Sequence, residues 1–344
     1  MTSTIPQNEM SVTGSLSPTE LCFCPKGNTA QVVERKNFSE EKRKQILELH
    51  KLNKRWNLVI PLHFILWFLG GWIALLTDQW IFTFAGWVIA GISLSALSAL
   101  AHESSHNLFT RKPRVDRWIG FLCGVPILFS TAGYRVMHSM HHKRVRTEED
   151  PDDIENVTRN AQVLRIVYVL ILFFGVYVFL YNVPVGGLKR GSPRERRDIL
   201  TEGLAMVGIV VIGWLVLPTV VMVNGWLVPV LIAGFIANIR GLAEHGFTSQ
   251  GNEMVDTRTV ATHPVVSFLM CNINYHLEHH LYPGVPWYNL PKLHRLLQED
   301  YRKAGSSVYT SYTIFMLDTF RAIKAGAVPG KRLIPNHLRE ELCL

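Results

Sequence analysis

The chain has 344 residues, 48% of them hydrophobic, and a formal net charge of +8 at pH 7. The apolar residues form long runs with lysines and arginines beside them, which favours membrane orientation and attraction to anionic lipid and argues against nucleic-acid binding. The five cysteines fit neither a disulfide framework nor a paired CxxC zinc site.

The N-terminal part predicts a polar tail followed by two membrane spans. Residues 1–36 are rich in Ser, Thr, Pro, Gln and Asn, and we expect a disordered N-terminal tail there. Residues 39–55 predict a helix with Ser39 as its N-cap, and the basic residues of this helix place it on the cytoplasmic side. The uncharged runs 57–76 and 80–101 are each long enough to cross about 30 Å of hydrocarbon.

Two apolar segments in the middle of the chain are not predicted to cross. Residues 118–130 are too few for a span and favour a re-entrant or interfacial segment. Residues 163–183 have the length of a span, but the arginines and lysine of the following loop, 184–200, place both ends of the segment in the cytoplasm. We therefore expect 163–183 to lie in the interface or to form a shallow hairpin near Gly175.

The last two spans are predicted over residues 203–222 and 225–243, with a turn at Asn224-Gly225. The sequence thus predicts an all-α, multi-pass integral membrane protein with four transmembrane helices, and with both termini in the cytoplasm.

The domain organisation follows from these segments. Residues 37–310 are expected to form one membrane domain, which includes a short amphipathic helix at about 291–302. A cytoplasmic helical cap on this domain would hold a histidine-rich dimetal site. Residues 311–344 are expected to be a C-terminal cytoplasmic extension.

Eight of the fourteen histidines fall into three short clusters. Within each cluster the spacing is i, i+4 or i, i+3, i+4, which puts the imidazoles on one face of a helix. The clusters are His102 and His106, then His138, His141 and His142, then His276, His279 and His280. Eight imidazoles exceed the needs of one four-coordinate zinc ion, so two metal ions use them better.

The predicted place of the clusters narrows the chemistry. They lie at the cytoplasmic ends of spans, beside lipid, which favours a substrate with a long apolar tail. Imidazole ligands do not by themselves name the metal. Modifying an alkyl chain requires cleavage of a strong C–H bond, which iron with O₂ can perform and redox-inert zinc cannot.

The motifs HESSH, HSMHH and HLEHH, in this order and at these intervals, resemble the three histidine boxes of the membrane fatty acid desaturase superfamily. Glu149-Asp150-Pro151-Asp152 and the segment from Asn274 to Pro283 are similar to the family as well, and the resemblance covers roughly residues 60–300. Members of the family are integral membrane, non-haem diiron enzymes that use O₂ and two electrons.

The resemblance implies two iron ions, with O₂ as co-substrate, and a double bond introduced into the acyl chain of a membrane-associated lipid or fatty acyl thioester. The implied ligands are the eight clustered histidines and His245, at the end of the last span. In acyl-CoA members an asparagine one turn before this histidine holds a metal-bound water. This chain has Gly241 there, and Asn238 or Asn274 are the candidate substitutes.

Four carboxylates are candidates to accept a hydrogen bond from the far nitrogen of a ligand imidazole and so orient it. They are Glu103, Asp150, Glu244 and Glu278. The other histidines, including His294, are expected to be structural or exposed.

The electron donor is predicted to be a separate protein, of ferredoxin or cytochrome b5 type, because the chain contains no His-Pro-Gly-Gly haem motif. Box three begins with His276, where front-end desaturases have a glutamine, so the resemblance is not to that subgroup. A basic cytoplasmic face is the predicted surface either for docking an acidic carrier or for lipid headgroups. Its residues are Lys143, Arg144, Arg146, Arg194, Arg196 and Arg197.

Three alternatives remain open from the sequence. A hydroxylase or ketolase acting on carotenoid or sphingolipid would use the same scaffold. His102-Glu103-Ser104-Ser105-His106 also satisfies the H-E-x-x-H pattern of a membrane zinc metalloprotease, with Glu103 as general base. A metal transporter would string its ligands through the middle of the spans.

Overall fold

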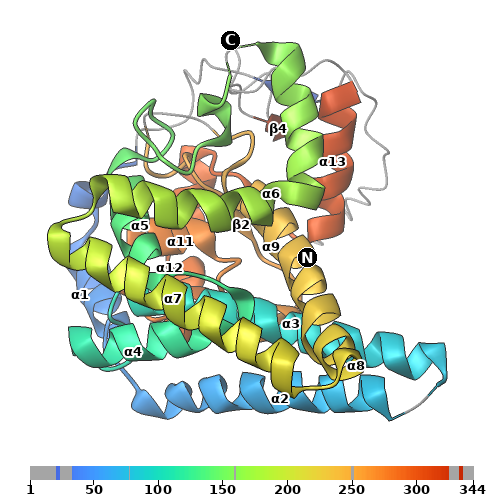
Figure 1. The fold of residues 1–344 in the computed structure, drawn as a ribbon. Helices are drawn as coiled ribbons and strands as arrows, with labels where there is room; N and C mark the ends of the chain where they lie inside the picture. Colours follow the sequence, from blue (N-terminus) through green and yellow to red (C-terminus); the bar gives the residue numbers. More distant parts are fainter. Residues whose placement is uncertain are drawn as a thin grey trace, which may run out of the picture.

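The structure, a computed structural model, is built mainly of helices (Figure 1) and describes residues 21–23, 33–76, 78–158, 160–248, 252–324 and 333–335. The longer helices are α1 (Glu40–Leu49), α2 (Val59–Leu75), α3 (Trp80–Ser105), α4 (Pro113–Gly124), α5 (Thr131–Arg144), α6 (Ala161–Arg190), α7 (Pro193–Val216), α9 (Val228–His245), α12 (Leu290–Ala304) and α13 (Tyr312–Lys324). The shorter ones are α8 (Thr219–Met222), α10 (Pro264–Leu269) and α11 (His276–Leu281).

Strands play a small part among the described residues. Strand β1 (Leu21–Phe23) pairs antiparallel with β4 (Leu333–Pro335), and β2 (Thr259–Val260) pairs parallel with β3 (Val308–Tyr309). Within the predicted tail 1–36 the structure thus describes β1 and residues 33–36. The expectation for 1–20 and 24–32 falls outside the described residues.

Five helical segments are long and apolar enough to cross a membrane. They are Lys54–Leu75, Trp80–Ser105, Gln162–Arg190, Pro193–Val216 and Thr219–His245, and a sixth results if the bent pair formed by Pro113–Ile127 and Thr131–Arg144 is one span. Helices α2 and α3 form an antiparallel pair (Figure 1). Their backbones meet at Gly70 and Gly86, because a Cβ built on Gly86 would lie 2.5 Å from the carbonyl oxygen of Gly70. The predicted count of four spans remains a prediction.

Helix α6 replaces the hairpin expected near Gly175, so that alternative is wrong, whereas the interfacial position of 163–183 stays a prediction. The chain is helical without interruption from Ala161 to Arg190. Figure 1 shows that the part of α6 beside α13 and the part leading into α7 run in different directions. Near Gly175 the Asn238 side chain of α9 packs against α6, and its Nδ2 donates to the carbonyl oxygen of Leu172 at 3.1 Å.

The turn predicted at Asn224-Gly225 is also wrong, because the chain turns one helical segment earlier. Leu217 is extended immediately before Pro218, and α8 starts at Thr219. Asn224 and Gly225 lie in a π-helical stretch, Val223–Leu227, that leads into α9. Within this stretch the Asn224 side chain donates to Val220 O and accepts from Trp87 Nε1, so it is used inside the helix bundle.

Two other predictions, on α1 and α12, agree with the structure, and the one on 118–130 stays a prediction. Ser39 caps α1 by accepting from the backbone N–H of Lys42. The apolar segment 118–130 holds the junction between α4 and α5, whose axes differ by 105° as in a broken span or a re-entrant loop. The amphipathic helix expected at about 291–302 is α12.

In the C-terminal extension, α13 packs against α9 and the first part of α6 through Phe315 and Ala322.

Candidate metal centre

The structure brings together all nine histidines proposed from the sequence, from four helices. His102 lies in the last turn of α3 and His106 follows directly as its C-cap, three lie on α5, His245 ends α9, and three lie on α11. Box one is in direct contact with the other boxes, since His106 Nε2 lies 3.0 Å from His138 Nε2 and the rings of His102 and His279 have centroids 4.5 Å apart. The helical spacing of each box produces this convergence, because it directs all imidazoles of a box to one side.

The ring nitrogens form two adjacent groups. The first contains His102, His106, His138, His142 and His279, and the second contains His141, His245 and His280, with ligand atoms in each group within 4.8 Å of one another. His276 joins the second group, because its Nε2 lies 2.9 Å from that of His245 and 3.0 Å from that of His280. The rings of His142 and His280 stack at 4.3 Å and link the two groups.

The chemistry of this donor set fits bound cations. A neutral imidazole has a single N–H, yet His138 Nε2 faces two other Nε2 atoms, those of His106 at 3.0 Å and His142 at 2.9 Å. Both ring nitrogens of His102 are buried without a hydrogen-bond partner, as are the Nδ1 atoms of His245, His276 and His279. Buried, unpaired nitrogens are costly unless something else binds them, and imidazole suits divalent metals of the first transition row.

Burial also sets the protonation state of the α11 histidines. Desolvation holds the pKa values of His276, His279 and His280 well below the usual 6.5, and neighbouring imidazoles lower them further. These side chains are therefore neutral at physiological pH. The neutral form is the one that binds a metal ion.

Asp150 meets its prediction as an imidazole acceptor. Its Oδ1 accepts from His141 Nδ1 at 2.8 Å, and its Oδ2 accepts from the backbone N–H of Arg146 at 2.9 Å. This pair fixes the His141 tautomer and leaves its Nε2 to face His245 and His280, the other members of its group.

The other three carboxylates have different contacts. Glu103 accepts from the backbone N–H of Trp287 at 2.9 Å, and Glu278 accepts from Thr259 Oγ1 and from His294 Nδ1. These contacts anchor α3 and α11 to their surroundings and do not reach a proposed ligand. Glu244 lies 3.7 Å from His276 Nδ1, too far for a hydrogen bond.

Two further contacts position the histidines and were missed from the sequence. The Tyr134 hydroxyl lies 2.9 Å from His138 Nδ1, one turn away on α5, and the i, i+4 spacing was an available signal. The fully buried Arg258 donates to the carbonyl oxygens of Ala243, Gly246 and Phe247. It thereby caps the end of α9 that carries His245, a role for which no local sequence pattern exists.

Arg146 is not part of the predicted basic docking face, and that assignment is wrong. Its guanidinium is 2% exposed and pairs with Asp153 at 2.6 Å and Glu155 at 2.8 Å. The Tyr168 hydroxyl donates to Glu155, so the pair belongs to a buried network that holds the loop after α5 in place.

The side-chain amides of the two asparagines considered in place of Gly241 both donate hydrogen bonds within the protein. Asn238 donates to Leu172 O in α6, and Asn274 donates to Val260 O and Ser267 Oγ. The Asn274 Oδ1 atom is buried without a hydrogen-bond partner.

Helical spans and a buried, two-part cluster of histidines at their ends define a multi-pass membrane protein with a candidate metal centre. A family profile described as "Fatty acid desaturase" matches residues 78–312. The chain belongs to this family, and it is an oxidoreductase of the desaturase type.

Three curated relatives are named as desaturases of lipids. The chain is 24% identical over 262 residues to the sn-1 oleoyl-lipid 12-desaturase of Arthrospira platensis, covering 68% of this chain and 72% of the relative. It is 24% identical to an sn-1 acyl-lipid omega-3 desaturase (ferredoxin) of Nostoc sp., covering 64% and 68%. It is 25% identical to the sphingolipid delta(4)-desaturase of Candida albicans, covering 65% and 64%.

The zinc metalloprotease alternative finds no support. Glu103, its general base, accepts from Trp287 N, and His102 and His106 lie among three more histidines from two other helices. Nor are the ligands strung along the spans as a transporter would require.

Proposed function

We propose that the chain is an O₂-dependent diiron oxidoreductase that introduces a double bond into the acyl chain of a membrane-associated lipid or fatty acyl thioester. The observation that carries the proposal is the pair of adjacent histidine groups at the ends of apolar helices. The names of the relatives, which act on oleoyl-lipid, acyl-lipid or sphingolipid, support a lipid substrate.

Each histidine group would hold one iron ion. His102, His106, His138, His142 and His279 would hold the first, and His141, His245, His276 and His280 the second. When bound, the irons supply the redox chemistry with O₂ that an unactivated C–H bond requires. The chain's own residues fix the imidazoles: Asp150 holds the Nδ1 proton of His141, and the Tyr134 hydroxyl contacts Nδ1 of His138. Burial of the cluster keeps bulk water away.

The overall reaction balances with an external donor. Two hydrogen atoms leave the acyl chain, and two electrons and two protons enter, so that O₂ is reduced to two water molecules. We propose a separate ferredoxin or cytochrome b5 type protein as the donor, and a relative named for ferredoxin supports this. The exposed Lys143 and Arg144, at the end of α5 beside His142, would receive an acidic carrier.

We also propose that the histidine cluster and both termini face the cytoplasm, because the loop between α6 and α7 and the end of α5 are rich in lysine and arginine. This orientation places both ends of α6 on one side, so that α6 would not cross the membrane and the other four candidate segments would. Fusing a compartment-sensitive reporter to either terminus tests the orientation. A periplasmic or lumenal signal would contradict it.

The function is tested by product and metal analysis of the full chain. The protein is expressed in a host of defined lipid composition, with the His142→Ala variant as the inactive control, and acyl chains are analysed by mass spectrometry. A new product two mass units lighter supports desaturation, and one sixteen units heavier shows a hydroxylase instead. Two irons per purified chain are expected, and a single zinc would contradict the proposal.

A further inference from the structure

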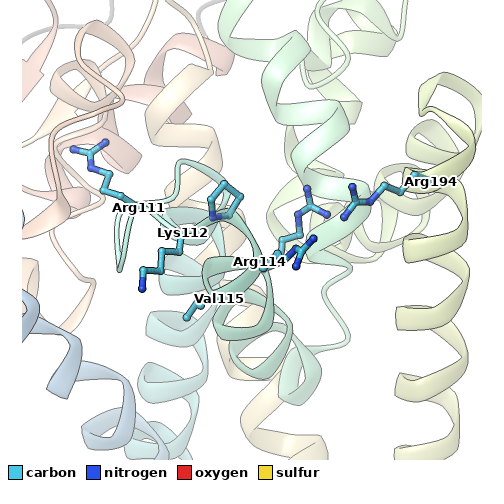
Figure 2. Close-up of a pocket in the computed structure, with 7 residues that line it drawn as sticks. Arg111, Lys112, Arg114, Val115 and Arg194 are labelled. Carbon is cyan, nitrogen blue, oxygen red and sulfur yellow. The ribbon is translucent and has the colours of Figure 1, made fainter.

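A cluster of cations lies away from the histidine centre, where the loop before α4 meets the start of α7. An open depression of about 550 Å³ is lined by Arg111, Lys112, Pro113, Arg114, Val115, Arg117 and Arg194. Five of these seven residues are cationic and none is acidic. Figure 2 shows Arg114, at the start of α4, and Arg194, at the start of α7, among the side chains that line the depression.

The charges of this cluster are largely uncompensated. Arg117 pairs with Asp198 at 3.5 Å and thereby joins α4 to α7. The nearby Glu195 is occupied by the backbone N–H and hydroxyl of Ser192, and Asp116 is buried under hydrogen bonds from the backbone of residues 109, 110 and 112. Among the described residues, Arg114 and Arg194 have neither an ion pair nor a side-chain hydrogen bond. Several cations that line one depression, with few acidic partners, favour a bound anion.

The surroundings identify the kind of anion. On α4, Val115, Trp118 and Leu122 share one face and are exposed, Trp118 to 67%. On α7 the charged first turns give way to exposed Leu200 and Leu204, the latter 75% exposed. Both helices therefore change from charged to apolar at the cation cluster, which is the pattern of the headgroup level of a bilayer, with a tryptophan at the interface.

We propose that this depression, the α4–α7 site, binds the phosphate of an anionic phospholipid headgroup, with the acyl chains along the apolar faces of α4 and α7. Guanidinium groups of Arg114 and Arg194 would donate to the phosphate oxygens, and Arg geometry suits such paired donation. An acidic protein would meet the same charge but would also have to cover the exposed apolar faces beside it. The site contains no metal ligand, so it stands independently of the proposed function.

The test uses the full chain in non-ionic detergent and native mass spectrometry with phosphatidylglycerol and phosphatidylcholine of the same acyl chains. The double variant Arg114→Gln/Arg194→Gln is compared with wild type. The matched control is Arg43→Gln/Lys44→Gln, which removes the same charge from the exposed face of α1. Thermal unfolding of each variant verifies that it folds.

Affinity for phosphatidylglycerol is expected to fall on the order of tenfold in the double variant, since each basic residue near an anionic lipid contributes measurably. It should stay unchanged in the control, and phosphatidylcholine binding should stay unchanged in both. If the double variant does not fold, the salt dependence of lipid binding by the wild type tests the proposal. Rising salt must weaken its binding of phosphatidylglycerol more than its binding of phosphatidylcholine.

Three results would overturn the proposal. The first is unchanged phosphatidylglycerol affinity in the folded double variant. The second is equal binding of inorganic phosphate and the lipid, which would show a site for the free anion. The third is that the double variant no longer takes up electrons from a reduced acidic carrier but keeps its affinity for phosphatidylglycerol, which would show a protein-docking surface.

Discussion

At the scale of single residues, the hydrogen bond between Asp150 and His141 is the contact that prediction and structure share most directly. Asp150 follows box two by eight residues, and its 2.8 Å contact orients the imidazole that faces the second histidine group. A carboxylate in this place raises the basicity of the ligand and fixes its tautomer.

Replacing Asp150 by asparagine should therefore lower iron affinity about ten- to a hundredfold while the fold persists. Iron bound per chain, measured at controlled free iron, reports the effect. The exposed neighbour Glu149, changed to glutamine, is the control. Equal iron affinity in the Asp150→Asn protein and the control would contradict a role for Asp150.

Arg258 gives a second prediction at this scale. Burial lowers the pKa of Arg258 to about 10, still high enough for a charged guanidinium at neutral pH, and three carbonyl oxygens at the end of α9 accept from it. Arg258→Met leaves these oxygens unpaired and should lower the free energy of unfolding by about 3 kcal/mol. Denaturation in detergent measures this, and the exposed Arg302→Met serves as comparison, with a change below about 1 kcal/mol expected.

At the scale of elements, a helix or a contact could be predicted from the sequence where residues close together in the chain determine it. Histidine spacing fixes a helix face, so the convergence of the imidazoles within each box could be predicted. The uncharged runs likewise predicted α2 and α3. Arg146 carried no sign that Asp153 and Glu155 would enclose it, because its burial results from tertiary packing. Asn224 and Gly225 are common in solvent-exposed turns, but here they lie within the helix bundle. The residue that marks the turn is Pro218, because it forces Leu217 out of the helix.

The contact of α2 with α3 yields a prediction with an internal control. A Cβ at Gly86 would meet the backbone of α2 at 2.5 Å from Gly70 O and 2.7 Å from Ala74 N, and neither atom can move aside. Gly86→Ala should thus destabilise the protein by about 2 kcal/mol. Gly208→Ala, on α7 with nothing within 4 Å, should stay within about 1 kcal/mol of wild type. Equal melting temperatures for the two variants would contradict close packing of α2 and α3.

At the scale of the whole molecule, the histidine centre joins segments that are distant in sequence: the end of α3, α5, the end of α9 and α11. The imidazoles of the centre face one another, and nitrogens such as both of His102 are buried without a hydrogen-bond partner. Buried nitrogens of this kind are costly without a partner, and a bound metal ion would turn the cluster into a cross-link between helices. The free energy of unfolding should consequently depend on metal, because a ligand that binds only the folded state stabilises it.

Removing metal with a chelator should therefore lower the melting temperature of the detergent-solubilised chain. Fe²⁺ at about a hundredfold excess over its dissociation constant should restore about 2.7 kcal/mol per site. Mg²⁺ should restore nothing, because it prefers oxygen ligands. Replacing His142 and His279 by alanine removes ligands from the first group alone, so the variant should keep part of the Fe²⁺ response and bind one ion in place of two. A full two-ion response in that variant would show that the first group does not hold metal.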